Sequence, residues 1–391
     1  MLNYPFQRTT AGEQPAYYRL GAQRSVIAVT LPSGQQASLV ARHRDVKNCL
    51  RDTRLSRAAM GALNGPRLTV TGPDPAFGLL GLDPPRHTAI RRIVQPAFTV
   101  QEASRVAEQL RQNANALLTQ MTSDADQADL HESFSIPFNS MVICEMFSLP
   151  KQDAQQLHRH VRNTQSLDAV DAPHREASYN TLRSIFTELT ASASQHDDNG
   201  PLRALDDAAA NGHISRSEQL QLSMNLFIGG LSSGAHFFTS TVLHLLQRPA
   251  NWAALVDGSI SISHAVEEAL RYDVAGDSGL PRLATADIPL QDSTIMAGTI
   301  VIPGIALANR DPRVFAKADQ FDINRHPNPH LGFGAGPHYC IGAHLARTQL
   351  NVGLAVLTRR LPRLALATSP HDLRWVNNNV TGGVQTLPVT W

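Results

Sequence analysis

Apolar residues recur at the spacing of an α-helix over a long stretch that begins just after Ser215. The apolar or small residues that fall on one face of this stretch are Leu220, Met224, Phe227, Leu231, Ala235, Phe238, Val242 and Leu245. The pattern predicts one buried helix of roughly 30 residues, about 45 Å long, that crosses the whole molecule. Ser215 and Glu218 have the spacing of a capping box, which marks the start of the helix. Its centre, from Gly229 to Gly234, contains glycines that cost about 1 kcal/mol each, so we expect a large group to pack there.

Runs rich in β-branched residues predict a small amount of β-structure. Residues 25–31 and 37–40 flank a Pro-Ser-Gly turn and predict a β-hairpin. Residues 281–284, 288–290 and 299–303 are also strand-like, and we expect them to form a small sheet of their own.

The remaining pattern is mainly helical. Residues 101–195 predict helices that are broken at Pro137 and at Pro150, because proline removes a backbone donor. Asp83 precedes two prolines and predicts a helix start with the aspartate as N-cap. Residues 57–82 contain several glycines and prolines without a clear period, which is typical of a long functional loop.

Composition indicates a globular protein, and the net charge counts against a nucleic-acid-binding function. The 391 residues are 42% hydrophobic and 17% charged, which supplies enough apolar material for a sizeable core. A net charge of +1 counts against a nucleic-acid-binding protein, which usually carries a strong basic excess. The elements predicted above give a mainly α fold with small β-sheets, and a length of 391 residues fits either one large domain or two to three average ones.

Cysteine use and hydropathy predict a soluble, cytoplasmic protein. Cys49, Cys144 and Cys340 are widely spaced and include no C-x-x-C pair, which counts against a disulfide framework and a structural zinc site. No uninterrupted apolar stretch approaches the roughly 20 residues needed to span a bilayer. We expect a monomer that has neither a membrane nor a nucleic-acid partner.

The candidate chemistry is concentrated in residues 333–342, which read FGAGPHYCIG. Cys340 lies just before a predicted helix, whose positive end stabilises a thiolate. The flanking glycines let the backbone approach a flat ligand closely, and free amides can hydrogen-bond the sulfur. These are the requirements of a thiolate that ligates haem iron. A lone cysteine in a loop is usually only a small buried hydrophobe, but here the whole pattern is present.

The pattern F-G-x-G-x-H-x-C-x-G resembles the haem-binding loop of the cytochrome P-450 family, of its soluble bacterial type. The resemblance runs from the first predicted hairpin to the last residue, so it implies a single large domain over residues 1–391. It also implies that this domain encloses haem b as the cofactor. It implies that Cys340 is the iron ligand and that Phe333, Gly334, His338 and Gly342 form the loop around it.

A second group of residues resembles the part of this family that binds the haem propionates. His87 and Arg91 are four residues apart, so they share one helix face and can donate to a carboxylate together. A solvated basic face is the alternative. By resemblance, Arg282 is the second arginine at the propionates, although it could also be a plain surface charge.

A third group resembles the family's buried glutamate–arginine network. Glu268 and Arg271 are three residues apart on one predicted helix, a pair that is most often exposed and weak. The resemblance implies instead that they join Arg325 in the core, with a structural role.

The centre of the long predicted helix resembles the oxygen-binding segment of the family, with one departure. The family usually has an acid followed by an alcohol after Ala/Gly-Gly. Aligning Gly229 and Gly230 with that pair places Ser232 at the acid position and Ser233 at the alcohol position. We take both serines as candidate catalytic residues. The missing acid leaves the route of protons to bound oxygen open.

The resemblance implies a haem-thiolate monooxygenase that hydroxylates an apolar small molecule of secondary metabolism. The chain has no flavin or nicotinamide motif, so a ferredoxin and its reductase are the expected electron donors. Three alternatives remain: oxidative C–C or C–N coupling without oxygen insertion, a non-catalytic sensor, and a peroxide-driven oxidant. Substrate contacts are expected from residues 57–82, 229–233, 278–280 and 381–384.

Overall fold

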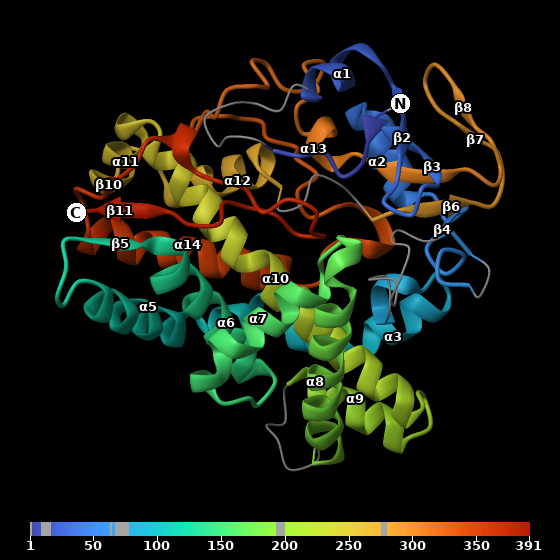
Figure 1. Ribbon diagram of the computed structural model, residues 1–391, viewed down its shortest axis with the longest axis horizontal. Coiled ribbons are helices and arrows are strands. Elements are labelled where there is room, and N and C mark those ends of the chain that lie inside the picture. The colour runs from blue at the N-terminus through green and yellow to red at the C-terminus, as the bar shows by residue number, and fades with distance from the viewer. Residues whose placement is uncertain (1, 9–16, 63–64, 67–77, 193–199, 275–279) are drawn as a thin grey trace.

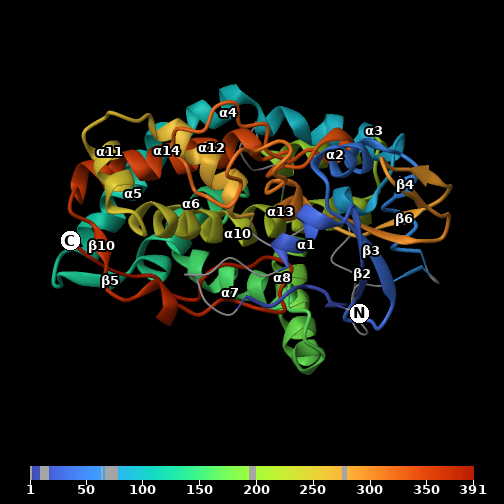
Figure 2. The same ribbon diagram turned by 90° about the horizontal axis from the view of Figure 1, so that it is seen from above.

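In the computed structural model, one long helix, α10 (Arg216–Leu246), runs through the middle of the molecule (Figures 1 and 2). The structure describes residues 2–8, 17–62, 65–66, 78–192, 200–274 and 280–391. The predicted capping box is confirmed, because the Ser215 side chain accepts from the Glu218 amide and the Glu218 side chain accepts from the Ser215 amide. In the described part of the chain, α10 alone has the length and hydropathy of a membrane span, but 61% of its most apolar window is buried inside the protein. We therefore assign α10 as a core helix of the protein and not as a membrane span.

Helices from most of the chain surround α10, and α6, α8, α9 and α12 contact it directly. In chain order the helices are α1 (Tyr18–Gln23), α2 (His43–Arg51), α3 (Arg86–Val94), α4 (Val100–Arg105), α5 (Ala107–Met121), α6 (Ile136–Met146), α7 (Ala154–Thr164), α8 (Ala172–Ala191), α9 (Pro201–Ala210), α10, α11 (Pro249–Val256), α12 (Ile262–Tyr272), α13 (Ile305–Ala308) and α14 (Ala343–Arg360).

Aromatic side chains fill the contact between α10 and its neighbours. The Phe238 ring of α10 lies 5.5 Å from that of Phe138 and 5.3 Å from that of Phe134. α14 approaches closely because Gly353 has no side chain: a Cβ there would lie 2.3 Å from the Phe238 ring. This packing fixes α10 and α14, the two helices between which the candidate site lies.

The strands lie at two opposite ends of the molecule (Figure 2). They are β1 (Leu2–Asn3), β2 (Val26–Thr30), β3 (Gln36–Val40), β4 (Leu55–Ser56), β5 (Gln127–Asp129), β6 (Arg282–Ala284), β7 (Ile288–Pro289), β8 (Thr294–Ile295), β9 (Ile300–Pro303), β10 (Ala365–Leu366) and β11 (Pro388–Thr390). The larger sheet has the order β1-β2-β3-β9-β6-β4, and the sheet at the other end has the order β10-β11-β5. The expectation of a mainly helical fold with small sheets is confirmed.

The predicted hairpin is also confirmed, with Val26 paired to Val40. The prediction that residues 281–303 form a sheet of their own is wrong. β9 pairs in parallel with β3 and antiparallel with β6, so it joins the hairpin in one sheet, whereas β7 pairs only with β8. Buried side chains such as Val301 need cover on both faces, which the larger sheet provides.

Two local predictions on helix ends are corrected. The N-cap of α3 is Pro85, not Asp83, and the Asp83 carboxylate instead accepts hydrogen bonds from the Ser56 hydroxyl and the Arg57 amide. Pro137 lies in the first turn of α6, directly after a one-turn π-helix at His131–Ser135, so the helical path continues through it but changes type beside the proline. Of the predicted loop at residues 57–82, residues 63–64 and 67–77 lie outside the described residues, and Gly78–Gly81 form a short 3-10 helix, η1.

The buried network is confirmed. Arg271 donates to both carboxylate oxygens of Glu268 at 2.8 Å, and Arg325 donates to the same carboxylate at 3.1 Å. Glu268 and Arg271 are fully buried, and Arg271 also donates to the carbonyls of Asn309 and Ala318. Because every donor and acceptor is satisfied, the network ties α12 to the segment before the cysteine loop.

Candidate active site

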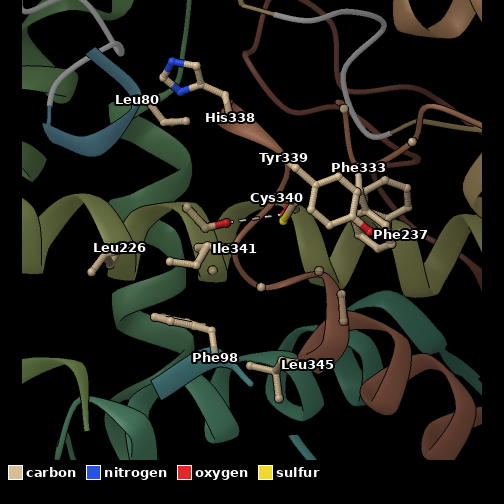
Figure 3. Close-up of a pocket in the computed structure, with 18 of the residues that line it drawn as sticks. Leu80, Phe98, Leu226, Phe237, Phe333, His338, Tyr339, Cys340, Ile341 and Leu345 are labelled. Atoms are coloured by element: carbon tan, nitrogen blue, oxygen red, sulfur yellow. Dashed lines mark hydrogen bonds between the residues drawn. The ribbon is translucent and has the colours of Figure 1, made fainter. Parts of the chain in front are cut away.

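A cavity of about 380 Å³ lies between α10 and the loop that carries Cys340. All eight residues predicted to bind the cofactor line it: His87, Arg91, Arg282, Phe333, Gly334, His338, Cys340 and Gly342. Figure 3 shows Cys340 in the middle of the site, in front of α10, with Leu226 and Phe237 to either side along that helix. Segments more than 250 residues apart in the sequence therefore meet at this cavity.

The cysteine loop is a tight turn that delivers the sulfur to the start of α14. The Cys340 amide donates to the Phe333 carbonyl at 2.9 Å, and Gly342 is the N-cap of α14. Gly336 has a φ of +72°, and a Cβ there would lie 2.7 Å from the Leu50 carbonyl oxygen, so only glycine lets the loop approach α2. The local motif thus fixes where the thiol points.

The Cys340 thiol is accessible from the cavity but otherwise enclosed by protein. Desolvation raises the pKa of the thiol, while a hydrogen bond from the Gly342 amide and the cations Arg91 and Arg347 lower it. A bound metal ion would displace the thiol proton outright. The surroundings therefore favour a ligated sulfur over a free thiolate.

Glu267 of α12 stabilises the cysteine loop through one residue on either side of it in the chain. The Glu267 carboxylate accepts from Arg347 at 2.6 Å and from His330 at 2.9 Å, and Arg347 also donates to the Tyr339 hydroxyl. Burial raises the pKa of Glu267, but these hydrogen bonds outweigh it and lower the pKa to about 2. The carboxylate stays ionised and clamps both ends of the cysteine loop.

One end of the cavity is lined by cationic and donor groups without a protein anion. Arg282 is 5% exposed, its Nε has no hydrogen-bond partner, and burial lowers its pKa to about 10. His87 is 1% exposed, and neither of its ring nitrogens has a partner. Burial, together with Arg282 and His87, lowers the pKa of the neighbouring His338 to about 3. No Asp, Glu or Lys is among the described residues that line the cavity.

On the opposite side, α10 presents small residues to the cavity. Gly229, Gly230, Ser233 and Gly234 all line it, and the Ser233 hydroxyl donates to the Gly229 carbonyl at 3.4 Å. Ser232 does not line the cavity and is buried on another face of α10. Because successive helix residues are about 100° apart, the two serines cannot face the same space, so Ser233 alone of this pair is placed to contact reacting atoms.

Only some of the segments expected to contact substrate line the cavity. Leu79, Leu80 and Leu280 line the cavity, whereas Ser278 and Gly279 lie outside the described residues. Residues 381–384 are not among the described residues that line the cavity: a Cβ on Gly383 would lie 2.6 Å from Nδ1 of buried His236, so this segment packs against α10.

The cavity has four further polar residues, and sequence reasoning missed three of them: Asn139, Asn225 and Gln349; the fourth, Arg57, falls within the expected segment 57–82. Arg57 donates from its Nε to the Leu80 carbonyl at 2.9 Å, which brings its guanidinium to the cationic end. Asn139 of α6 donates to the Leu231 carbonyl at 3.1 Å and to the Gly230 carbonyl at 3.4 Å. None of the three belongs to a local motif, and only their tertiary contacts reveal them.

Comparison with known proteins agrees with this geometry. The family model for cytochrome P-450 matches residues 262–370. Nocardicin C N-oxygenase of Nocardia uniformis subsp. tsuyamanensis is 34% identical over 392 aligned positions, which cover 100% of this chain and 98% of that protein. The chain belongs to the cytochrome P-450 family. Mycinamicin IV hydroxylase/epoxidase of Micromonospora griseorubida, another relative, is 34% identical and covers 99% of this chain and 98% of that protein.

Solved structures of cytochromes P-450 share the whole fold. Cytochrome P-450mel, described as having biaryl coupling reactivity, superposes with a TM-score of 0.91 at 28% sequence identity, covering 100% of this chain and 99% of that one. The relatives of this cytochrome P-450 thus include oxidases of bacterial secondary metabolism that insert oxygen and one that couples rings.

Haem is the cofactor of this family, and the residues present fit it. The orphaned donors of His87 and Arg282 suit carboxylates such as the haem propionates, which would supply the anions that the described residues lack. The glycines of α10 and the cysteine loop leave flat surfaces on two sides, and Cys340 would hold the iron. When bound, haem supplies the activation of O2.

Proposed function

We propose that this cytochrome P-450 hydroxylates a neutral, largely apolar small molecule of bacterial secondary metabolism. The observation that carries the proposal is the cavity that Cys340 and Ser233 both line, together with the apolar side chains of Leu79, Leu226 and Phe237. The reaction takes up O2, two electrons and two protons, and releases the hydroxylated product and one water. Apolar walls exclude bulk water, which favours transfer of oxygen to the substrate over its loss as peroxide.

Ser233 is the residue of this chain that we assign to proton handling. Its hydroxyl is the one alcohol of α10 on the cavity surface among the described residues, and the Gly229 carbonyl holds it in place. A hydroxyl can donate one hydrogen bond and accept two, so it can pass a proton from an ordered water to a bound ligand. The described lining has no carboxylate to back it, so water or substrate completes the relay in this proposal.

We further propose that electrons come from a ferredoxin and its reductase, which dock on the side of the cysteine loop. The chain carries no flavin or nicotinamide fingerprint of its own. Tyr339, next to the proposed iron ligand, is 38% exposed, so the cysteine loop reaches the surface and is open to a docking partner. A cytoplasmic, monomeric protein is the form we expect to act in this way.

Oxidative coupling is the second candidate function, because of one observation. Serine occupies the position of the family's usual acid, and the relative cytochrome P-450mel is described as coupling aryl rings. Coupling removes two hydrogen atoms from the substrates, forms the new bond, and reduces O2 with two external electrons and protons to two waters. No oxygen atom enters that product.

Labelled oxygen separates these functions. Turnover is measured with 18O2, spinach ferredoxin and its reductase, against hydrogen peroxide alone and against no reductant. Product that carries 18O supports hydroxylation, and a coupled product without label supports the second candidate. Turnover with peroxide but not with ferredoxin, or none under any condition, would reject both. Cys340→Ala should abolish turnover and the red-shifted Soret band of the reduced carbon-monoxide complex, whereas Cys144→Ala, at a buried cysteine that does not line the cavity, should keep both.

A further inference from the structure

Three residues of α10 follow one another along the cavity wall at a spacing of four. Asn225, Gly229 and Ser233 all line the cavity. With a rise of about 1.5 Å per residue, Asn225 lies about 12 Å along the helix axis from Ser233. The cavity wall therefore has a polar group at the reaction end and another two turns away.

The Asn225 carboxamide has no hydrogen bond to any residue in the described part of the chain. The side chain is held in place by shape instead, since it packs on the backbone of Gly78 in η1. Gly78 has a φ of +64°, and a Cβ there would lie 2.7 Å from the Asn225 Cγ. The fold thus makes room for this side chain, which lines the cavity together with Leu79, Leu80 and Leu226 and is not hydrogen-bonded to the described residues.

A leucine of similar volume would fill the same place against Gly78 without a polar group to desolvate. A carboxamide in an apolar wall is favourable only when a ligand or water completes its hydrogen bonds. A carboxamide carries no net charge to balance a charged ligand group, so the group that complements Asn225 is neutral. An amide oxygen accepts and its NH2 donates, which matches a group that does both.

We propose that Asn225 is a specificity-determining residue that hydrogen-bonds a neutral carboxamide or lactam group of the substrate. The inference rests on the proposed function, because it requires the substrate to occupy this cavity. It narrows the substrate to a molecule with an apolar body and one neutral amide-like group, set about two helical turns from the atom to be oxidised.

The test uses ligands that anchor at the iron and extend along α10. N-alkylimidazoles of increasing chain length, ending either in a methyl group or in a primary carboxamide, are titrated into the holoenzyme. The Soret shift reports each dissociation constant. The carboxamide series should bind more tightly than its methyl partner over a narrow window of lengths, by about three- to tenfold, as expected for one neutral hydrogen bond.

Variants at position 225 distinguish recognition from packing. Asn225→Leu should lose the carboxamide preference while the methyl series binds as before. Asn225→Asp should transfer the preference to imidazoles that end in an ammonium group. Leu226→Asn, made in the Asn225→Leu background, is the matched control: this neighbour lines the cavity about 100° away around α10, and it should not restore the preference.

The results of these titrations distinguish a failure of the Asn225 proposal from a failure of the proposed function. A carboxamide series that never exceeds the methyl series, or a preference that persists in Asn225→Leu, overturns the role of Asn225 and leaves the proposed function standing. Equal weakening of both series in Asn225→Leu shows a structural role only and also overturns it. Failure of every imidazole to shift the Soret band overturns the proposed function and this inference together.

Discussion

Arg282 and His87 show how a single buried group reveals an absent partner. Arg282 makes only two long hydrogen bonds, both of 3.3 Å, to the carbonyls of Cys49 and Leu50, and its Nε has none. A buried cation with so few partners is costly unless an anion joins it. The pattern is that of a site that is complete only with a carboxylate-bearing ligand.

Removal of Arg282 should therefore weaken haem binding. Hydrogen bonds to charged groups contribute about 1.5–3 kcal/mol, so Arg282→Ala should raise the rate of haem transfer to apomyoglobin by about ten- to a hundredfold. Arg91→Ala should act in the same direction. Arg54→Ala, an exposed arginine paired with Asp52, is the control and should leave haem transfer unchanged. Equal haem loss from the Arg282→Ala and unaltered proteins would contradict this placement.

The proposed role of the Ser233 hydroxyl in proton transfer can be tested by a single substitution. If its hydroxyl carries protons, Ser233→Ala should raise the fraction of electrons that end as hydrogen peroxide several-fold, because proton delivery through α10 to the cavity is then interrupted. Ser232→Ala is the matched control, since Ser232 is buried away from the cavity and should leave that fraction unchanged. The measurement is the ratio of peroxide formed to NADPH consumed. Full coupling in Ser233→Ala would exclude the relay role.

At the scale of elements, α10 and α6 meet through one asparagine. The Asn139 carboxamide lies against α10 and donates to two of its carbonyls, where position 234 has no side chain. A Cβ on Gly234 would lie 1.8 Å from Asn139 Oδ1, so the two residues fit only as a pair. This contact holds the small-residue segment of α10 beside the cavity.

Gly234→Ala should consequently be destabilising in spite of its better helix propensity. Overpacking of this kind costs about 1–3 kcal/mol, and the urea midpoint of unfolding should fall accordingly. Asn139→Ala in the same chain should recover part of the loss, which a double-mutant cycle would measure. Gly229→Ala is the control, because nothing lies within 4 Å of its Cβ and alanine favours the helix. Additive effects of Gly234→Ala and Asn139→Ala would disprove the coupling.

These elements also show what the sequence could and could not predict. The cysteine loop and α10 were predictable because their signals, ten contiguous residues and a sustained helical period, are local. Asp83 was misassigned because its partners Ser56 and Arg57 lie more than 25 residues away in sequence, and a tertiary contact outweighed its preference for an N-cap. Asn139 and Asn225 carry no pattern at all, since their roles arise only when α6, α10 and η1 pack together.

At the scale of the whole molecule, a buried histidine cluster limits stability in acid. His131, His158 and His236 are each 3% exposed, and the rings of His131 and His236 stack at 5.0 Å. Burial lowers the pKa of His158 and of His236 from 6.5 to about 4, with nearby Arg162 acting in the same direction on both. His131 donates from Nδ1 to Thr239, whose own hydroxyl donates to the Ala235 carbonyl, so this ring is held neutral. The cluster packs between η3 (His131–Ser135), α7 and α10.

The lowered pKa values of these histidines determine the direction in which the stability of the protein changes with pH. Between pH 6.5 and about 4 the unfolded chain binds protons that the folded cluster does not, so stability falls as the pH falls through this window. A group whose pKa is 6.5 in the unfolded chain and about 4 in the folded protein should lower the free energy of unfolding at pH 5 by about 2 kcal/mol. Glu267 and Asp273 do not interfere, because carboxylates with lowered pKa lose their contribution only below their unfolded values of 4.5 and 3.8.

Urea unfolding of the holoenzyme, followed by the Soret band and by far-UV circular dichroism, should therefore give midpoints that decline between pH 7 and pH 5. His158→Gln removes one titrating ring and keeps a polar side chain, so its midpoint should be lower at pH 7 but should decline less steeply. His213→Gln, at an exposed position, is the control and should keep the original slope. Because the cluster lies behind α10, its protonation should loosen the helix that forms one wall of the cavity, and the Soret and circular dichroism transitions should shift together. A midpoint independent of pH over this range, or an unchanged slope in His158→Gln, would show that the buried histidines do not control acid stability.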